Sequence, residues 1–533
     1  MTSAESIASR ASIGATLAER AGRDPDRPYL ACDDVVLTYG AVDDSAARIG
    51  AGLAALGIAP GDRVCLMVPN GLEFVLAWLG VVRAGMVAVP INTAYRGDLL
   101  AYVLNHSGAS MAIVSEEWLD RFAFLEPQLQ HLRHVVTVPA AQPGAVTQAL
   151  RVPASPFSAL LRSAPAPLPQ VDDITAASIM YTSGTTGPSK GATLCHRGLL
   201  AFSANHVRHC GVTRDDVCFT CLPLFHAIAL ALTTVGALLV GARVAIGRRF
   251  SASTFWDEIR ASGATYASIT GSIAQILHKQ PLAPGDRDHR LRVVYAIPAP
   301  AAIYEDFERR FGTRFIEAYG ATDGQIPIYM PLDAPRIGAC GTVIPGFDLR
   351  IVDDRDDPLP AGSVGEIVYR GHDPYTMMLG YYRNPEATLE AWRNFWFHSG
   401  DLGFLDEDGY LHFVDRKKDS IRRRGENISS YEVEKIVNDH PAVLESAAVA
   451  VPAELGEDEL KIVVVVRPGE TLAPEALLGW CEPRLPYFMV PRYVEFTDAL
   501  PKTPNEKVQK YRLRETGVAK AWDRERAGYR VSR

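Results

Sequence analysis

The residues best suited to chemistry lie between Tyr181 and Gly191, where the chain reads Tyr-Thr-Ser-Gly-Thr-Thr-Gly-Pro-Ser-Lys-Gly. This segment combines five Ser and Thr hydroxyls with three glycines and one lysine. Glycine lets a backbone approach a ligand closely, and successive backbone N–H groups in such a turn form a concave anion site. The lysine adds a compact positive charge. The segment therefore predicts a phosphate-binding loop, delivered by an apolar strand at residues 177–180.

The spacing of this loop excludes a Walker A motif and with it a P-loop kinase. That motif needs four residues between its first glycine and a Gly-Lys-Ser/Thr triplet. Counting from Gly184 puts Ser189 where the second glycine belongs, and Gly191 follows Lys190. A solvated loop is the ordinary alternative for this composition. The preceding strand and the lysine favour the phosphate-binding interpretation.

Four further segments carry polar groups that suit a nucleotide site. Glu317-Ala-Tyr-Gly-Ala-Thr-Asp323 ends a buried strand with an acid, and a carboxylate beside phosphates is a natural Mg²⁺ ligand. His398-Ser-Gly-Asp401 places an acid beside a glycine, as in sites that bind a ribose diol. Residues 416–424 carry six basic side chains, and residues 501–507 set a lysine in a proline-rich loop. Each segment taken alone is typical of an ordinary turn or a solvated surface loop.

The elements that must position these residues indicate an α/β fold of at least two domains. Helical and strand patterns alternate from residue 47 to 114, which favours wound αβ sheets, and residues 337–413 form a glycine-containing, β-rich portion. A smaller α+β unit follows, so we expect a large domain at 1–415 and a small, mobile C-terminal domain at 416–533. Residues 138–173, rich in Pro, Ala and Ser, predict a surface excursion or linker. Residues 227–242 predict a buried helix that leads to a strand at 242–246.

Size and composition fit a soluble protein with an ordinary core. The chain has 533 residues, is 47% hydrophobic and 22% charged, and carries a net charge of −8. The acidic balance argues against nucleic acid as the main partner. Residues 1–14 lack a signal-peptide core, and the uncharged stretch 227–242 is too short to span a membrane. We therefore expect a cytoplasmic protein without a membrane span; its oligomeric state stays open, a homo-oligomer included.

The cysteines give no sign of a disulfide framework, which fits a reducing compartment. Cys218 and Cys221 form a CxxC pair with His209 and His226 nearby. Zinc would need a second ligand pair, and no matching motif follows. Because both cysteines lie in an apolar run, a packing role is favoured.

Taken together and in this order, the five motifs resemble the adenylate-forming superfamily of acyl-CoA synthetases, peptide-synthetase adenylation domains and luciferases. The resemblance extends from Leu37-Thr-Tyr39 to Lys507. Arg422-Arg-Arg-Gly-Glu-Asn-Ile-Ser429 is most similar to the crotonobetaine/carnitine-type acid–CoA ligases. The resemblance implies ATP-dependent, AMP-forming activation of a small carboxylic acid through an acyl-adenylate, followed by thioester formation with coenzyme A.

The same resemblance implies a role for each residue of the nucleotide site. It implies that the β- and γ-phosphates of ATP are held by Thr182, Ser183, Gly184, Thr185, Thr186, Gly187 and Lys190. Tyr319 would stack near adenine, Thr322 would contact the α-phosphate, and Asp323 would help to hold Mg²⁺. Asp401 would receive the ribose hydroxyls, with Arg416 close by.

Further roles follow by resemblance for the C-terminal domain and the acid pocket. Lys418 would be the hinge on which this domain swings, Lys507 the lysine of the adenylation step, and Arg424 part of the face that serves coenzyme A. His226 would border the acid pocket. Residues 226–234, 270–276 and 324–329 supply pocket candidates, and their Ala, Gly and Ile content indicates an apolar acid of small to medium size.

The sequence departs from the family pattern at three places. The acid at Asp323 is usually glutamate, Glu506 stands where glycine usually precedes the lysine, and Ile297-Pro-Ala-Pro300 replaces a Gly-Ala-Pro stretch. Two alternatives stay open. The acceptor could be a carrier-protein thiol, an amine or nitrite instead of coenzyme A, or the chain could be a non-catalytic binding protein on the same fold.

Overall fold

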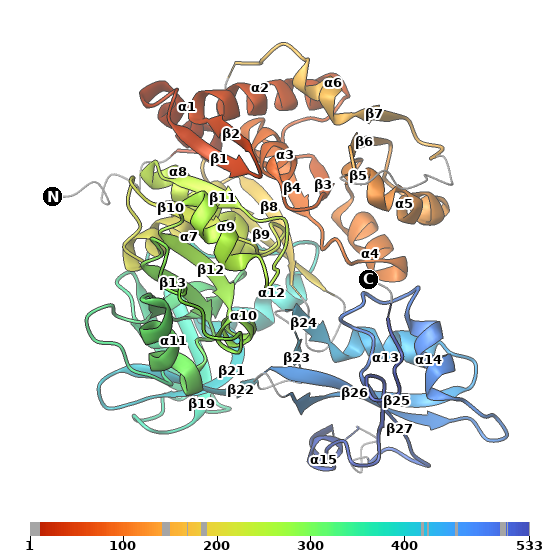
Figure 1. The fold of residues 1–533 in the computed structure, drawn as a ribbon. Helices are drawn as coiled ribbons and strands as arrows, with labels where there is room; N and C mark the ends of the chain where they lie inside the picture. Colours follow the sequence, from red (N-terminus) through yellow and green to blue (C-terminus); the bar gives the residue numbers. More distant parts are fainter. Residues whose placement is uncertain are drawn as a thin grey trace. The chain divides into compact units, whose positions relative to one another are not determined.

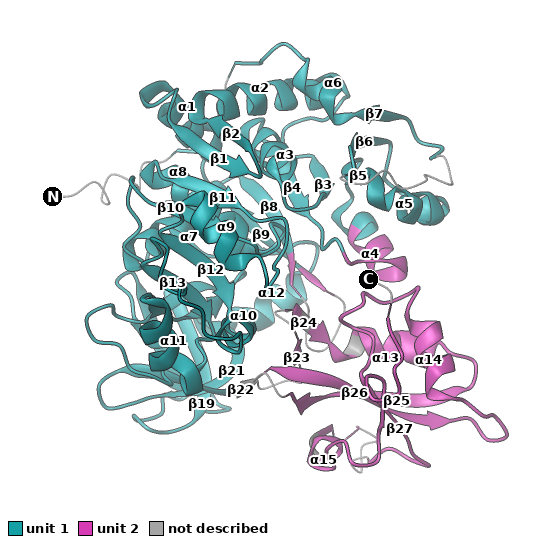
Figure 2. Cartoon of the chain, viewed as in Figure 1, with its two compact units in different colours: residues 1–93, 104–180, 191–415 teal, residues 94–103, 181–190, 416–533 magenta. Residues whose placement is uncertain are grey.

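The protein is described from a computed structural model (Figure 1). It describes residues 11–140, 150–167, 169–182, 189–416, 420–423, 426–453, 457–501, 508 and 510–531. The chain divides into two compact units, shown in Figure 2. Unit 1 comprises residues 1–93, 104–180 and 191–415, and unit 2 comprises residues 94–103, 181–190 and 416–533.

The first sheet of unit 1 has seven strands in the order β14-β13-β12-β10-β11-β1-β2. The strands from β14 to β1 pair in parallel, and β2 closes the edge antiparallel to β1. The strands are β1 Pro28–Cys32, β2 Val35–Thr38, β10 Val217–Thr220, β11 Arg243–Ile246, β12 Tyr266–Thr270, β13 Val293–Ile297 and β14 Arg314–Ile316. All of β12 is buried, as expected for a parallel strand covered on both faces.

The second sheet carries the two ends of the candidate phosphate loop. Its order is β20-β9-β8-β4-β3-β5-β6-β7, and β20 pairs antiparallel to β9. The strands are β3 Arg63–Met67, β4 Val87–Pro90, β5 Met111–Ser115, β6 His134–Val138, β7 Ala154–Pro156, β8 Ala176–Thr182, β9 Lys190–Cys195 and β20 Gly380–Tyr381. Since β8 ends at Thr182 and β9 begins at Lys190, the loop connects these two neighbouring strands.

The third sheet is built from antiparallel pairs and holds the other two nucleotide motifs. Its order is β15-β16-β17-β22-β21-β19-β18. The strands are β15 Ala318–Ala321, β16 Gln325–Tyr329, β17 Gly341–Val343, β18 Phe347–Val352, β19 Gly365–Gly371, β21 Phe397–Leu405 and β22 Tyr410–Arg416. The motif that ends at Asp323 contains β15 and the start of the turn to β16, and the His398–Asp401 motif lies in β21.

Unit 2 contains a two-stranded sheet and a four-stranded sheet in the order β25-β26-β27-β28. The strands are β23 Ser420–Arg423, β24 Glu426–Ser429, β25 Val443–Pro452, β26 Asp458–Val466, β27 Tyr493–Phe496 and β28 Trp522–Asp523. Its helices are α13 Ser430–Asn438, α14 Pro474–Cys481 and α15 Lys510–Glu515. Residues 94–103, which include the first part of α4, and residues 181–190 also belong to this unit.

The remaining helices belong mainly to unit 1. They are α1 Ile13–Arg23, α2 Tyr39–Ala55, α3 Leu72–Arg83, α4 Gly97–Ser107, α5 Leu119–Leu125, α6 Phe157–Leu161, α7 His196–His209, α8 Gly236–Val240, α9 Phe255–Ser262, α10 Gly271–His278, α11 Tyr304–Phe311 and α12 Pro385–Ala391. Short 3₁₀ turns occur at η1 Glu116–Trp118, η2 Glu126–Gln128, η4 Ala301–Ile303 and η5 Arg393–Phe395. Caps explain many boundaries: Oγ1 of Thr38 accepts the Ala41 N–H at the start of α2, and Gly263 ends α9 in the left-handed conformation.

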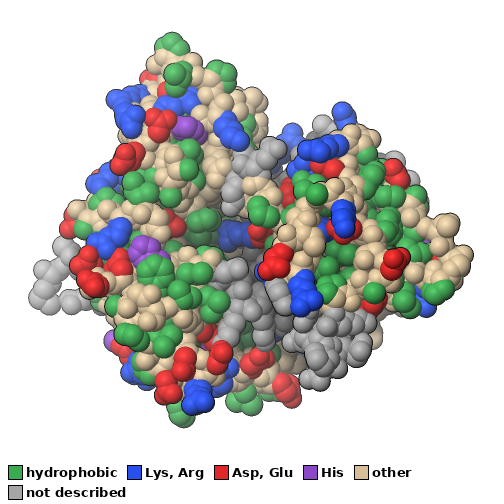
Figure 3. All heavy atoms as spheres, turned by 90° about the horizontal axis from the view of Figure 1, so that it is seen from below, with side chains coloured by type: hydrophobic (Ala, Val, Ile, Leu, Met, Phe, Trp, Pro, Cys, Tyr) green, Lys and Arg blue, Asp and Glu red, His purple; other side chains and the backbone are tan. Residues whose placement is uncertain are grey.

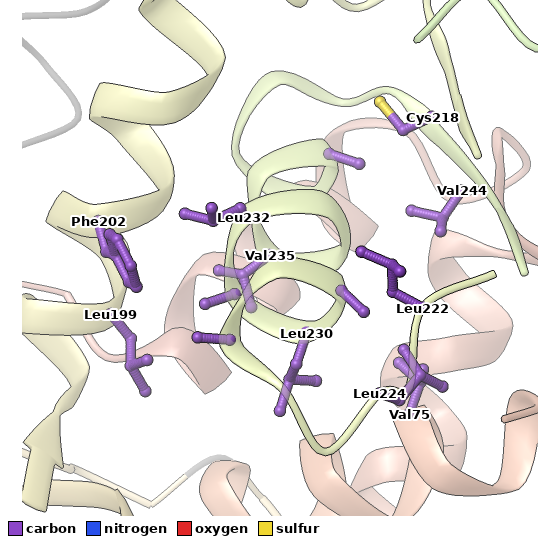
Figure 4. Packing of buried hydrophobic residues seen from close by; sticks show 14 of the residues in the cluster. Val75, Leu199, Phe202, Cys218, Leu222, Leu224, Leu230, Leu232, Val235 and Val244 are labelled. Atoms are coloured by element: carbon purple, nitrogen blue, oxygen red, sulfur yellow. The ribbon is translucent and has the colours of Figure 1, made fainter. Parts of the chain in front are cut away.

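A π-helix, η3 Ile228–Val235, lies in the core of unit 1, where Figure 4 shows its apolar side chains between those of α7 and the neighbouring strands. The Thr233 hydroxyl donates to the Ile228 carbonyl at 3.0 Å, and the Thr234 hydroxyl donates to the Ala229 carbonyl at 2.8 Å. Both bonds reach five residues back, which fits the wider π turn. Such turns are rare and often mark functional sites.

The predicted fold class is confirmed, because wound αβ sheets, a β-rich portion and a small α+β C-terminal part are all present. The prediction that residues 138–173 form a linker is wrong for β7 and α6. β7 pairs with β6, and α6 buries Phe157 and Leu160 in the core. These elements have three and five residues, too few to show a periodic pattern.

Two other boundaries differ from the sequence prediction. The buried stretch 227–242 is helical, as expected, but Ile228–Val235 within it forms a π-helix and only Gly236–Val240 an α-helix. The sequence also predicts one strand at 315–318, but the structure divides it at Glu317, because β14 belongs to the first sheet and β15 to the third. This change of sheet directs the residues after Glu317 into the candidate site.

The surface is mixed in charge over the face that Figure 3 shows, where acidic and basic side chains are interspersed among the described residues. No helix in the described part of the chain is long and apolar enough to cross a membrane.

Candidate active site

The turn between β15 and β16 is fixed by close packing around two glycines. A Cβ on Gly320 would lie 2.1 Å from the carbonyl oxygen of Gln325, and one on Gly324 would lie 2.0 Å from the hydroxyl of Tyr369. Gln325 itself has φ of 71°. No other side chain fits at either glycine without moving the backbone or the core. The motif therefore has one well-defined conformation.

Tyr319 and Asp401, predicted for adenine and ribose, are in direct contact. The Tyr319 hydroxyl donates to Oδ2 of Asp401 at 2.7 Å. Burial raises the pKa of Tyr319 well above its ordinary value, and the nearby Asp401 charge adds to the shift. The phenol therefore stays protonated and orients the carboxylate.

The backbone around Asp401 is held by residues that sequence reasoning missed. Oε1 of Glu366 accepts the Gly400 N–H at 3.2 Å. The Ser399 hydroxyl donates to the Ile367 carbonyl at 2.6 Å and accepts the Asp401 N–H at 3.1 Å. Glu366 is 5% exposed, so this support is buried in β19. The two strands together set the direction of the Asp401 side chain.

Asp323, predicted as the metal ligand, is held by a tyrosine on another strand. The Tyr381 hydroxyl donates to Oδ2 of Asp323 at 2.5 Å. Tyr381 lies on β20 and faces Ala192 on β9, the strand that follows the phosphate loop. Thr322 and Asp323 are both half-buried. One carboxylate of this kind, together with nucleotide phosphates, is the donor set that Mg²⁺ commonly uses.

The described ends of the phosphate loop are Thr182, Ser189 and Lys190. The Thr182 hydroxyl donates to the Lys190 carbonyl at 3.4 Å, and both residues are partly buried. Ser189, counted with the loop's hydroxyl donors, instead donates to a carboxyl group, Glu432 of α13, at 2.7 Å. The predicted phosphate contacts Ser183, Gly184, Thr185, Thr186 and Gly187 lie outside the described residues.

His226, predicted to border the acid pocket, lies two residues before the first residue of the π-helix, Ile228. Its ring packs against Phe225 with the centroids 4.6 Å apart. Its carbonyl accepts the Leu230 N–H at 3.1 Å, so the histidine forms part of the entry to this unusual helix. The backbone hydrogen bond to Leu230 therefore fixes the position of His226 at the start of this helix.

Two further titratable groups are buried: His206, which belongs to none of the motifs, and Glu317, which begins the Glu317–Asp323 motif but has no predicted role. His206 is hydrogen-bonded to the hydroxyls of Tyr266, at 2.7 Å, and Tyr329, at 3.2 Å, and burial lowers its pKa to about 3. Burial also raises the pKa of Glu317 to about 8, although the Ala299 backbone bonds to it. Both groups are thus neutral at pH 7. The amphipathic sequence pattern predicts that His206 lies on helix α7. It does not predict which tyrosine side chains His206 contacts.

The remaining predicted residues lie where the structure describes little or nothing. Arg416 ends β22, and its side chain is not described. Lys418, Arg424 and Lys507 lie outside the described residues, so their predicted roles stay predictions.

Among the described residues, no group of three or more His, Cys, Asp or Glu side chains is placed to hold a metal ion. All eight cysteines are free and buried. Cys218 and Cys221 belong to the apolar core of unit 1. Burial raises the pKa of the Cys221 thiol to about 12, so it stays protonated.

Comparison with known proteins agrees with this geometry. A family model described as AMP-binding enzyme matches residues 17–382, and one described as AMP-binding enzyme C-terminal domain matches residues 432–507. The crotonobetaine/carnitine–CoA ligase of Salmonella typhimurium is 31% identical over 495 residues, covering 91% of this chain and 95% of that protein. The chain belongs to the AMP-binding enzyme family.

Solved structures extend the comparison for this AMP-binding enzyme. The anthranilate CoA ligase AuaEII, solved with anthranoyl-AMP, is 25% identical with a TM-score of 0.71, covering 95% of this chain and 97% of that chain. The amide bond synthetase McbA from Marinactinospora thermotolerans is 24% identical with a TM-score of 0.83, covering 95% and 99%, and shows the shared fold alone. Family membership makes the protein an adenylate-forming enzyme that binds ATP.

Proposed function

We propose that this AMP-binding enzyme is an AMP-forming acid–CoA ligase. The observation that carries the proposal is its 31% identity with a CoA ligase over 495 residues, which cover 91% of this chain and 95% of that ligase. The oriented Tyr319–Asp401 pair supports the nucleotide half of the proposal, because a carboxylate with a fixed direction suits the two ribose hydroxyls.

In the first step, one oxygen of the substrate carboxylate attacks the α-phosphorus of ATP, the P–O bond to pyrophosphate breaks, and an acyl-adenylate forms. Two anions must approach each other, so fixed positive charge and preorganised donors lower the barrier. Lys190 and Lys507 supply charge in this proposal, and Thr322 contacts the α-phosphate. Mg²⁺, held by Asp323 and the phosphates, would neutralise charge that develops on the leaving group.

In the second step, the coenzyme A thiol attacks the acyl carbon, loses its proton, and releases AMP. We propose that a domain at 416–533 turns about Lys418 between the two steps. It presents Lys507 for adenylation and the face with Arg424 for the thioester step. Such a motion also keeps water from the reactive adenylate.

The acid proposed for this site is apolar and of small to medium size. The pocket candidates are residues 226–234, which include most of the π-helix, residues 270–276 at the start of α10, and residues 324–329, which include β16. In the second set Gly271, Ile273 and Ala274 are buried. Small and aliphatic side chains of this kind favour an apolar tail over a second charge.

A pyrophosphate-release screen over a panel of carboxylic acids tests the proposal. Each acid is assayed with ATP and Mg²⁺, with and without coenzyme A. The proposal expects release with at least one acid, steady turnover only when coenzyme A is present, and an equal amount of acyl-CoA. If turnover requires an amine, nitrite or a carrier protein instead of coenzyme A, the proposed acceptor is wrong and the proposed adenylation step stands. No ATP binding by calorimetry would favour the non-catalytic alternative.

A further inference from the structure

The last hydroxyl-bearing residue of the phosphate loop, Ser189, is bound by a carboxyl group within unit 2. Oε1 of Glu432 accepts both the Ser189 backbone N–H, at 3.1 Å, and the Ser189 hydroxyl, at 2.7 Å. Ser189 is 1% exposed and Glu432 is 4% exposed, so water competes little for these bonds. The contact joins residues 243 positions apart in the chain.

From the sequence, the Glu432 side chain would be expected to cap the N-terminus of its own helix, α13. Ser429-Ser-Tyr-Glu432 matches the capping box, in which the glutamate usually reaches back to the first backbone N–H. The serine half of this motif is present, since the Ser429 hydroxyl accepts the Glu432 N–H at 3.4 Å. The Glu432 carboxyl group instead accepts hydrogen bonds from Ser189. A side chain of a type that usually caps its own helix therefore makes a long-range contact.

Neighbouring side chains of unit 2 reinforce this contact. The Tyr102 hydroxyl donates to the Ser189 carbonyl at 3.1 Å. One turn further along α13, Lys435 pairs with Asp98 at 3.8 Å. The segments 94–103, 181–190 and α13 are therefore connected by several independent polar contacts.

The contact uses the donors that a phosphate would need. A backbone N–H beside a hydroxyl, followed directly by Lys190, is a typical phosphate-oxygen site. One carboxyl oxygen occupies both donors, and the other, Oε2, has no hydrogen-bond partner among the described residues. A buried polar atom without a partner costs free energy, so the contact is poised for exchange with a better ligand.

We propose that Glu432 is a positioning residue that holds the end of the phosphate loop in a nucleotide-free arrangement and is displaced when the ATP phosphates bind. The inference rests on the proposed assignment of this loop to the β- and γ-phosphates. ATP then binds only the fraction of molecules in which Ser189 is released, which lowers its apparent affinity by that fraction. AMP lacks these two phosphates and is unaffected.

Calorimetry of the whole protein with Mg²⁺–ATP and, separately, with AMP tests the proposal. Glu432→Ala removes the acceptor and is expected to strengthen Mg²⁺–ATP binding about fivefold to tenfold, with AMP binding unchanged within about twofold. Glu432→Gln keeps an oxygen acceptor and is expected to remain within about threefold of the wild type at pH 7. Glu434→Ala, on the same helix but bonded to Ala448 and Lys510, is the matched control and should change neither affinity.

Hydrogen exchange at the Ser189 amide provides a second measurement that does not depend on ligand. Without nucleotide, the amide should exchange at least about tenfold faster in Glu432→Ala than in the wild type, because its acceptor is lost. Unchanged exchange, or Mg²⁺–ATP binding that is equal or weaker in Glu432→Ala with AMP binding intact, would overturn the inference. A wild-type protein that binds no ATP would instead overturn the function itself.

Discussion

The Tyr319–Asp401 contact in unit 1 and the Ser189–Glu432 contact in unit 2 each hold a candidate nucleotide-binding group, by different means. Tyr319 lies beside Gly320, where a Cβ would meet a backbone carbonyl oxygen at 2.1 Å, so its position follows from dense packing. Ser189 is fixed instead by polar groups, one of which is a buried carboxyl with one oxygen that has no hydrogen-bond partner in the described part of the chain. The first arrangement is preorganised, and the second can be exchanged.

This difference indicates a division of labour. Groups that contact the unchanging part of the nucleotide, its base and ribose, benefit from a rigid frame that costs nothing to organise at the moment of binding. The triphosphate end loses pyrophosphate in every cycle, so contacts there must form and break. The Ser189–Glu432 contact suits that requirement, because it forms without ligand but leaves one carboxyl oxygen without a hydrogen-bond partner among the described residues.

The largest effect is expected from Lys507→Ala, which separates chemistry from binding. Loss of one preorganised charge should slow acid-dependent pyrophosphate release by at least about 10²-fold, since charge on the phosphorus is no longer neutralised. Mg²⁺–ATP affinity should change by less than about threefold. The exposed Lys520, changed to Ala, is the control. Near-normal release by Lys507→Ala would remove this lysine from its proposed role.

Gly320→Ala tests the rigid frame. The added Cβ must displace the backbone at Gln325, which should lower the free energy of unfolding by about 2 kcal/mol and weaken ATP and AMP binding together. Gly22→Ala, in α1 with nothing within 4 Å of the new Cβ, should be neutral or slightly stabilising. Thermal unfolding and calorimetry measure both. Wild-type stability in Gly320→Ala would mean that the turn adapts and that packing does not fix Tyr319.

Asp401→Asn tests whether this side chain binds the ribose, because ATP and AMP share the ribose and differ in their phosphates. The amide keeps the size of the side chain but loses the charge that strengthens hydrogen bonds to hydroxyls, so affinity should fall about tenfold. ATP and AMP should be affected equally, because both carry the ribose. A loss confined to ATP would place Asp401 near the phosphates and contradict its assignment.

The smallest effect concerns pH and the exchangeable contact. Burial raises the pKa of Glu432 from near 4.5 to about 7, partly offset by its bonds to Ser189 and by Lys435. Tyr95 and Tyr102 also face this region and stay neutral, since burial raises the pKa of each. Because burial disfavours the charged carboxylate, the buried position of Glu432 is fully stabilised below the ordinary pKa and loses stability as pH rises through about 7, although the two Ser189 bonds themselves favour the ionised form.

The apparent affinity for Mg²⁺–ATP should accordingly increase severalfold between pH 6 and pH 8 in the wild type. Glu432→Gln cannot ionise and should lack this component, which calorimetry at both pH values will show. An identical pH dependence in the two proteins would assign the titration to another group, including the nucleotide.

Much of this architecture could be predicted from the sequence, because its signals are local. Strand β8, the glycine-rich turn after Tyr319 and the acid of β21 each follow from a few neighbouring residues. The supporting partners could not be predicted, since Tyr381 reaches Asp323 over 58 positions and Glu432 reaches Ser189 over 243. For Glu432 the local signal even favours a different bond, the helix cap.

The π-helix shows the same limit in another form. Hydropathy predicts that residues 227–242 are buried and helical, but it does not predict that the Thr233 and Thr234 hydroxyls bond carbonyls five residues back. Thr233 also bonds Ser268 on β12 at 3.0 Å, a contact that only the packed sheet creates. Tertiary structure thus selects the helix type at a position where the sequence allows several.

The most direct test of the account follows one oxygen atom. With an accepted acid whose two carboxylate oxygens are both ¹⁸O, attack on the α-phosphorus must leave one labelled oxygen on AMP after the thiol has taken the acyl group. We expect one ¹⁸O per AMP by mass spectrometry, produced together with acyl-CoA and pyrophosphate. Unlabelled AMP, or ADP and phosphate as products, would contradict adenylation of the acid.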